Sequence, residues 1–278
     1  MNGDEHLSVY LMKFGGNAIR GKDDLDRLSG EIAQLISEGM KIILVHGGGP
    51  EITAEIEKRG LSTTMVGGFR ITDENLLNVV DEVLKRLNDD ITDSLKNAGV
   101  NAKGMSGYFE KMITCVKKEP IKVKNGNETI TADLGMVGEV DKVKVDMINK
   151  ILSENVTPVI YPVCASEDGT HMNVNADTVA SGIAAAVGCR EMIFITDVPG
   201  ILRDVNDKES KIDETTLTEI DAMIADGTIS GGMIPKVEAC RDAILAGVAA
   251  VRMVNGKDKN SIVSDVMKNK HHGTLIRG

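Results

Sequence analysis

The sequence predicts an α/β fold, a three-layer α/β/α sandwich in which a mostly parallel central sheet lies between two layers of helices. Along most of the chain, short apolar runs of strand length alternate with stretches whose apolar residues repeat at helical spacing. The run Ile42–Val45 is continuously apolar, which is typical of a strand covered on both faces. Strands and helices that alternate in this way form parallel sheets with helices on both sides. One predicted hairpin interrupts the alternation.

The first part of the chain contains two strands and three helices in this pattern. We expect a strand over Ser8–Lys13, a strand over Ile42–Val45 and a helix that begins after Pro50. The other two helices are predicted from apolar residues at helical spacing, which are Leu25, Leu28, Ile32, Leu35 and Ile36 in the first and Leu76, Leu77, Val80, Val83, Leu84, Leu87 and Ile91 in the second.

The segment Ile121–Val140 has a different pattern. Its apolar and polar residues alternate around Asn125-Gly126, a dipeptide typical of a tight turn, so we expect a β-hairpin. Helices and strands then resume. We expect strands over Val156–Val163, Glu191–Thr196 and Ala249–Val254, and helices over Val145–Leu152, after Asn173–Asp177, over Leu217–Asp226 and over Val237–Ala246.

Length and composition limit the possible classes of function. A chain of 278 residues with no linker and no internal repeat is expected to form one large domain or two closely packed lobes. The net charge of −10 argues against nucleic acid as the main partner, because a phosphate backbone requires a basic surface. The acidic N-terminal segment has no secretory signal, and no apolar run approaches the length of a membrane span. The four cysteines are scattered without metal-binding spacing, which indicates reduced thiols and a cytoplasmic protein.

Polar and glycine-rich residues follow several of the predicted strands. Lys13-Phe14-Gly15-Gly16-Asn17 follows the first strand, and His46-Gly47-Gly48-Gly49-Pro50 follows the second. Asn173–Asp177 and Asp197-Val198-Pro199-Gly200 follow two later ones. The carboxyl ends of parallel strands meet at one edge of a sheet, where ligands of such folds bind. Backbone N–H groups of glycines can approach an anion there, and Lys13 adds a positive charge.

Known motifs exclude several alternatives. There is no GxxxxGK[ST] segment, so the chain is not a P-loop protein, and HGGGP is not the dinucleotide-binding GxGxxG. HGGG is similar to an esterase oxyanion loop, but Gly104-Met105-Ser106-Gly107 is not the GxSxG motif that an esterase also needs. We expect His46, His171, His271 and His272 to be structural or exposed, because nothing in the sequence pairs them.

Two further charged residues stand next to predicted helix starts. Arg70 lies in Gly68-Phe69-Arg70-Ile71-Thr72-Asp73, where it is either a carboxylate-binding fork or a surface residue before a helix capped by Thr72 or Asp73. Lys236 follows Pro235 in the first turn of a helix, a position that the helix dipole disfavours for a cation, so a functional role is indicated. Asn175 is expected to cap its helix and Asp177 to fall in the first turn, which alone is also an ordinary helix start.

Together these motifs resemble a known family. KFGGN, HGGGP, GFRITD, MNVNAD, TDVPGIL and GGMIPKV occur here in the order and spacing found in the amino acid kinase superfamily, and most closely in its acetylglutamate kinase branch. The resemblance extends from Leu11 to Thr274. It implies one amino acid kinase domain over residues 1–278, with an N-terminal lobe (1–172) for the acyl substrate and a C-terminal lobe (173–278) for the nucleotide.

The resemblance also implies a role for each matching residue. Lys13 and Lys236 are expected to stabilise the transferred phosphoryl group, and Asp177 is expected to hold both lysines. The acyl substrate is expected to contact Gly48 and Gly49, Arg70 through the substrate's α-carboxylate, and Asn173. Phosphate oxygens are expected to accept N–H groups of Gly15, Gly16 and Gly48. The remaining nucleotide contacts are implied for Asp197, Gly200, Leu202, Ile229 and Ser230.

The implied reaction is transfer of a phosphoryl group from ATP to the side-chain carboxylate of N-acetyl-L-glutamate in arginine biosynthesis. Mg²⁺ is expected as a cofactor, held by the ATP phosphates, Asp177 and water rather than by a cage of protein ligands. A carboxylate is already ionised at neutral pH, so no general base is needed.

The segment Gly104–Glu110 departs from the GLSGKDG-like segment of many family members, and the helix before it lacks their GKVNK pattern. The acceptor therefore stays open between acetylglutamate and the substrates of other superfamily kinases, carrier-linked aminoadipate or glutamate, or carbamate. A non-catalytic, nucleotide-sensing regulator is the third alternative. Arginine-inhibited members of the family have a longer N-terminal helix that links dimers into a hexamer, whereas only 12 residues precede Lys13 here, so the resemblance implies a homodimer that arginine does not inhibit.

Overall fold

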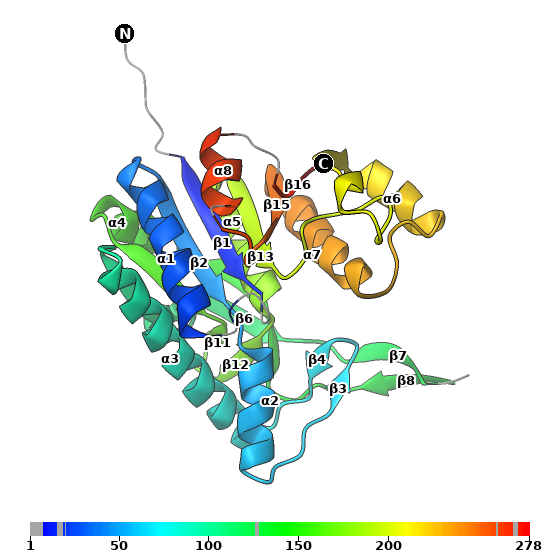
Figure 1. The fold of residues 1–278 in the computed structure, drawn as a ribbon. Helices are drawn as coiled ribbons and strands as arrows, with labels where there is room; N and C mark the ends of the chain where they lie inside the picture. Colours follow the sequence, from blue (N-terminus) through cyan, green and yellow to red (C-terminus); the bar gives the residue numbers. More distant parts are fainter. Residues whose placement is uncertain (1–7, 16–18, 20, 126–127, 260, 269–271) are drawn as a thin grey trace.

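An eight-stranded sheet forms the centre of the protein (Figure 1). The computed structural model describes residues 8–15, 19, 21–125, 128–259, 261–268 and 272–278. Every neighbouring pair of strands in this sheet is parallel except β15 and β16. In spatial order the strands are β14 (Glu214–Thr216), β16 (Thr274–Arg277), β15 (Ala250–Asn255), β13 (Glu191–Thr196), β1 (Val9–Phe14), β2 (Lys41–His46), β10 (Thr157–Tyr161) and β5 (Ala102–Ser106).

Helices cover both faces of the sheet, so the predicted three-layer fold is confirmed. Leu11 of β1 points into one apolar cluster, and its neighbours Tyr10 and Met12 point into the other. The Leu11 side is covered by α4 (Val145–Ser153), α5 (Ala176–Val187), α6 (Leu217–Ala225) and α7 (Ile234–Leu245). The opposite side is covered by α1 (Lys22–Ser37), α3 (Glu74–Asn97) and α8 (Ser261–Lys268).

A smaller β-structure lies beyond the carboxyl ends of β2 and β10. Four strands close a small barrel in the order β11 (Val163–Ala165), β12 (His171–Val174), β9 (Val137–Val143) and β6 (Ile113–Lys117). Two hairpins accompany it, β3 (Met65–Val66) with β4 (Phe69–Arg70), and β7 (Ile121–Asn125) with β8 (Glu128–Ala132). Figure 1 shows both hairpins and α2 (Gly49–Lys58) together at the bottom of the view.

Most predicted elements are present, but several short strands were not predicted. The apolar run Val156–Val163 is divided at Pro162 between the central sheet and the barrel, because proline lacks the N–H that a continuing strand would need. The predicted hairpin is confirmed as β7 and β8, whose register pairs Asn125 with Glu128. Asn125 is thus the last residue of β7 rather than part of the turn as predicted, and Gly126 lies outside the described residues. The strands and α-helices without a sequence prediction are β3, β4, β5, β6, β9, β12, β14, β16 and α8.

Several local predictions can be checked directly. Asn175 caps α5 by accepting the N–H groups of Asp177 at 2.7 Å and Thr178 at 3.3 Å. Asp73, rather than Thr72, caps α3. All four cysteines are free and buried. Within the described residues no helix has both the length and the apolar character needed to cross a membrane.

Candidate active site

Lys13 and Lys236 face the same cavity at the carboxyl edge of the central sheet. Lys13 lies near the end of β1, where it is in register with Phe194 of β13, and Lys236 lies in the first turn of α7. The cavity has a volume of about 190 Å³. Its polar lining consists of Lys13, Asp177, Thr196, Asp197 and Lys236. Residues from four distant parts of the sequence therefore meet in one place, as the strand-end argument predicted.

Asp177 forms an ion pair with Lys13. Lys13 Nζ lies 2.6 Å from Asp177 Oδ1. At this distance the ammonium group of Lys13 is the partner of the buried Asp177 oxygen. Asp177 lies in the first turn of α5, and its backbone N–H is bonded to the side chain of Asn175, which caps the helix. Phe194 lies beneath the ammonium group of Lys13, 5.9 Å from ring centre to Nζ. Asp177 thus fixes the ammonium group of Lys13 at the wall of the cavity.

Lys236 is paired with a different carboxylate, which corrects the expectation that Asp177 holds both lysines. Lys236 Nζ donates a hydrogen bond to Asp197 Oδ1 at 2.6 Å. This hydrogen bond is the main reason that the pKa of Asp197 is lowered from its ordinary value. Asp197 directly follows β13, so it reaches α7 from the neighbouring strand end. Each lysine therefore has its own carboxylate.

A second cavity of about 350 Å³ adjoins the first and shares Lys13 and Asp177 with it. It extends from these two residues towards the barrel and the β3–β4 hairpin. The residues predicted to bind the acyl substrate all line it, and they are Gly48, Gly49, Arg70 and Asn173. The structure thus brings the predicted phosphoryl-transfer residues and the predicted acyl-binding residues to two cavities with a common wall.

Arg70 is a buried cation without a carboxylate. Its side chain is on β4 and the residue is only 8% exposed. Its guanidinium donates to Thr63 Oγ1 at 3.1 Å and to Thr53 Oγ1 at 2.8 Å. Within the described residues it forms no ion pair with an acidic side chain, and burial lowers its pKa. Since a buried guanidinium is stable only when an anion or several acceptors compensate it, this site is suited to a carboxylate ligand.

The three glycines after β2 bring backbone close to the second cavity. A Cβ on Gly48 would lie 2.6 Å from Leu87 Cδ1 and 2.9 Å from Leu84 Cδ2, so any larger residue would force these two side chains of α3 to move. Gly49 is the first residue of α2, and the first N–H groups of a helix have no partner within it. These N–H groups form a donor surface for an anion at the wall of the cavity.

Asn173 is placed on the opposite wall, on β12. Its Nδ2 donates to Thr72 Oγ1 at 3.4 Å. This bond holds the amide at the end of the barrel, from which it lines the acyl-binding cavity.

The predicted phosphate contact of Gly15 differs from the structure. Its N–H donates to the carbonyl of Ile195 at 2.9 Å, which continues the pairing of β1 with β13. That N–H is therefore unavailable to a phosphate in this conformation, although Gly15 does line the first cavity. Gly16 lies outside the described residues.

The remaining predicted nucleotide contacts are dispersed. Asp197 lines the first cavity, whereas Gly200, Leu202, Ile229 and Ser230 line neither of the two cavities. Ile229 is buried in the apolar cluster on the Leu11 face, and its N–H donates to the carbonyl of Met223 at 2.8 Å. Gly200 has a φ of +126°, which residues with a side chain rarely adopt, and it packs against Thr274. The backbone conformation therefore explains why glycine occupies this position. Nucleotide binding by these four remains a prediction.

Sequence reasoning missed the residues that support the site. Thr53 and Thr63 hold Arg70, but threonines in a helix and a loop give no recognisable signal. His46 was expected to be structural or exposed, and it is structural: it is buried, and it contacts Asn88 at 3.0 Å and the carbonyl of Gly47 at 2.8 Å, neither of which the sequence indicated. His171 stacks on Tyr108 with ring centres 4.0 Å apart. His272 lies near the C-terminus, and His271 is not among the described residues.

No group of three or more His, Cys, Asp or Glu side chains in the described part of the chain is arranged to hold a metal ion. One side chain, Asp177, places a carboxylate at the wall shared by the two cavities, and 33% of this side chain is exposed. A single carboxylate of this kind suits Mg²⁺ that arrives with most of its ligands from phosphates and water.

Comparisons with known proteins agree with this geometry. Residues 8–255 match the amino acid kinase family. Relatives named acetylglutamate kinase are 37% identical in Methanobrevibacter smithii, over 98% of this chain and 94% of the relative, and 38% identical in Methanococcus maripaludis, over 98% and 92%.

Solved structures with the same fold share much less sequence. An N-acetylglutamate synthase from Neisseria gonorrhoeae has a TM-score of 0.80 at 18% identity, and it covers 98% of this chain, which spans 59% of the synthase. A carbamate kinase from Giardia lamblia bound to AMP-PNP has a TM-score of 0.70 at 16% identity, with 98% and 99% covered. At this level of identity, the structural likeness supports the fold alone.

Proposed function

The chain belongs to the amino acid kinase family, and from this premise we propose that it transfers the γ-phosphoryl group of ATP to the side-chain carboxylate of N-acetyl-L-glutamate. The products are ADP and N-acetyl-L-glutamyl 5-phosphate, an intermediate of arginine biosynthesis. The nearly full-length similarity to acetylglutamate kinases supports this substrate. The four buried free thiols support a cytoplasmic enzyme.

One observation carries the proposal. The cavity that contains both lysines and the cavity that contains Arg70 share the Lys13–Asp177 wall. The nucleotide phosphates fit the first cavity and an acyl amino acid fits the second, with Arg70 facing the substrate's α-carboxylate. The side-chain carboxylate of such a substrate then reaches the shared wall, where phosphoryl transfer takes place.

The residues at the shared wall supply positioning and charge rather than acid–base catalysis. The acceptor carboxylate attacks the γ-phosphorus in its ionised form, and the bond from that phosphorus to the β–γ bridging oxygen breaks to release ADP. Two anions must approach each other, so the barrier is largely electrostatic. Lys13 and Lys236 stabilise the charge of the transferring group, Asp177 and Asp197 fix the two ammonium groups, and the N–H groups around Gly48 and Gly49 donate to the anions.

Mg²⁺ would be held by the Asp177 carboxylate together with phosphate oxygens and water. When bound, it supplies positive charge that polarises the phosphoryl oxygens.

The proposal is tested by ADP release with three acceptors compared side by side: N-acetyl-L-glutamate, L-glutamate and L-2-aminoadipate. We expect turnover with acetylglutamate and at least tenfold lower kcat/KM with the other two. A preference for aminoadipate, or for a carrier-linked substrate, would assign the chain to another branch of the family. No acceptor-dependent ADP release with any substrate would favour the non-catalytic regulator.

We also propose that the enzyme is a homodimer. The strand β5 ends the central sheet of the described chain, and a strand at a sheet edge presents unpaired backbone groups that can meet a second copy. Light scattering at micromolar concentration is expected to give twice the mass of the 29.8 kDa chain. A monomer or a hexamer would contradict this assembly.

A further inference from the structure

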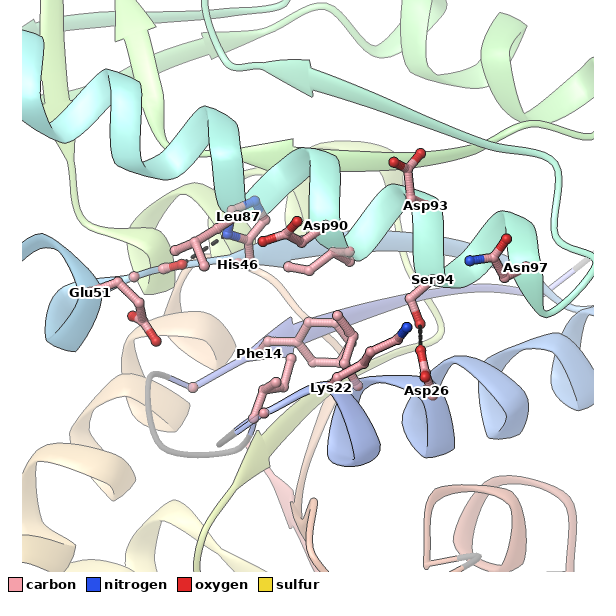
Figure 2. A pocket seen from close by; sticks show the side chains of 17 residues that line it. Phe14, Lys22, Asp26, His46, Glu51, Leu87, Asp90, Asp93, Ser94 and Asn97 are labelled. Atoms are coloured by element: carbon pink, nitrogen blue, oxygen red, sulfur yellow. Dashed lines mark hydrogen bonds between the residues drawn. The ribbon is translucent and has the colours of Figure 1, made fainter.

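His46 is buried at the end of β2, directly before the three glycines. The residue is 2% exposed, although histidine is usually found at least partly in contact with water. Figure 2 shows its ring between β2 and α3, and a dashed line marks its contact with the next residue, Gly47. A buried polar ring at the base of a ligand-binding loop requires an explanation that core packing alone does not give.

A chain of hydrogen bonds fixes which nitrogen of His46 carries the proton. Asn88 Nδ2 donates to the carbonyl of Val159 at 2.9 Å, and because a carbonyl can only accept, the orientation of the Asn88 amide is settled. The second N–H of the same group points to His46 Nε2 at 3.0 Å, so Nε2 must be the acceptor. The proton of the neutral ring is therefore on Nδ1, which donates to the carbonyl of Gly47 at 2.8 Å.

The surroundings hold this arrangement in place. The facing residue on β5 is Gly104, where a Cβ would lie 2.1 Å from Asn88 Oδ1. Burial lowers the pKa of His46 to about 4, so the ring is neutral at neutral pH. The Asn88–His46 pair is thus a neutral, fixed donor system rather than a general base.

The bond to Gly47 determines the direction of the next N–H. The described chain contains no cis peptide bond, and in a trans peptide the C=O and the following N–H point in opposite directions. The carbonyl of Gly47 is turned towards the His46 ring, so the N–H of Gly48 is turned away from it. His46 lines a separate cavity of about 590 Å³ between α1 and α3, shown in Figure 2, and it does not line the acyl-binding cavity. Gly47 and Gly48 line both cavities, so turning away from His46 directs the Gly48 N–H to the side of Lys13 and Arg70.

We propose that His46, held by Asn88, is a positioning residue that orients the Gly47–Gly48 peptide so that the Gly48 N–H donates to the anion at the Lys13 end of the acyl-binding cavity. This inference rests on the proposed kinase function for its effect on rate. Its geometric part, the tautomer and the peptide orientation, does not depend on that function.

Three variants separate positioning from packing. His46→Asn keeps an N–H at the place of Nδ1, whereas His46→Leu keeps a similar volume and loses both nitrogens. His272→Leu, which changes an exposed histidine that lines none of the three cavities described, is the control. We expect His46→Leu to lower kcat by about 10- to 100-fold, as for the loss of an aligned anion donor, with the KM for ATP nearly unchanged. His46→Asn is expected to stay within about fivefold of wild type, because it can still donate to Gly47.

Two results would overturn the proposal. One is wild-type turnover in His46→Leu. The other is an equal loss of turnover and melting temperature in His46→Leu and His46→Asn, which would assign the ring a packing role only.

Nuclear magnetic resonance of the ¹⁵N-labelled full-length protein reads the tautomer directly, with His46→Asn used to assign the signal. We expect a proton on Nδ1 and an unprotonated Nε2 at pH 7. A proton on Nε2, or an imidazolium, would overturn the inferred orientation. If the wild-type protein releases no ADP with any acceptor, the proposed function fails, and the tautomer still decides the geometric part of this inference.

Discussion

Replacement of Arg70 by methionine is expected to weaken substrate binding strongly while hardly changing stability. Arg70 is 8% exposed, and within the described residues its guanidinium has two threonine hydroxyls but no carboxylate. Loss of one member of a buried charge pair costs about 2–5 kcal/mol of binding. Since this cavity is open to solvent on one side, we take about 3 kcal/mol, which raises the KM for acetylglutamate by about 100-fold at about 1.4 kcal/mol per factor of ten.

Stability responds differently because the ligand-free protein has no anion to lose. The variant gives up three hydrogen bonds, to Thr63, to Thr53 and, at 3.5 Å, to the carbonyl of Gly49, each worth about 1 kcal/mol or less, but it also removes a charge whose burial was only partly compensated. The two contributions oppose each other, so the melting temperature is expected to change by less than about 4 °C, the equivalent of about 1 kcal/mol in a chain of this size.

The assay measures ADP release as a function of acetylglutamate at saturating ATP, together with thermal unfolding. Arg70→Lys keeps the charge without the planar fork and is expected to raise the KM about tenfold. Arg86→Met is the control, since Arg86 is an arginine of α3 with a side chain 54% exposed. A KM for acetylglutamate within fivefold of wild type in Arg70→Met would refute the assignment of this guanidinium to the substrate.

The remaining predictions concern the lysines, the buried histidine and the glycines. Lys13→Ala and Lys236→Ala are each expected to lower kcat by about 30- to 1,000-fold, or about 2–4 kcal/mol, with smaller changes in KM, in the same ADP assay; near-wild-type turnover in either would remove that lysine from the chemistry. The pKa of His46 is about 4 in the folded protein, against about 6.5 unfolded, so the unfolded chain binds a proton that the native state does not. The free energy of unfolding should therefore fall by about 3 kcal/mol as the pH drops from 6.5 to 4, and urea titrations of His46→Asn should lack this part of the loss. Gly48→Ala is expected to cost about 1–3 kcal/mol because the new methyl group meets α3, whereas Gly49→Ala, with no atom within 4 Å of its Cβ, should be neutral or slightly stabilising by urea denaturation; equal costs would contradict the packing argument.

The parts of the site that follow from strand order were predictable from sequence. Parallel strands place their carboxyl ends at one edge, so Lys13, the glycines after His46, Asp177 and Asp197 were expected to meet there. Asn175 was identified as a helix cap because Asn at that position has a local partner two residues later. The helix cap could be predicted because its partners lie within one helical turn in the sequence. The meeting of strand ends could be predicted because the apolar pattern indicates a parallel sheet.

Contacts between distant segments were not predictable in the same way. Lys236 and Asp197 are 39 residues apart, and their pairing depends on how α7 packs beside β13. The N–H of Gly15 is already bonded to Ile195 because the pairing of β1 with β13 continues beyond the apolar run from which the strand was predicted. In the small barrel, β12 was missed because its four residues are too few to show a period of two.

The two separate ion pairs have a consequence for how the substrates enter. Lys13 and Lys236 carry two positive charges, and their partners Asp177 and Asp197 carry two negative charges, so the cavity that holds both lysines has a net charge near zero before any ligand binds. The protein as a whole carries a charge of −10. Neither the cavity nor the global field therefore attracts a free polyphosphate, and a carboxylate substrate adds further negative charge.

The lysines become effective only when a ligand anion replaces part of their contact with the aspartates. A nucleotide whose charge is already reduced by a divalent cation meets less repulsion from those aspartates, and the Asp177 carboxylate lies at the wall shared by the two cavities, where such a cation would arrive. The pairing of each lysine with its own carboxylate thus favours the metal-bound nucleotide over the free one, and it keeps both ammonium groups oriented until the phosphates arrive.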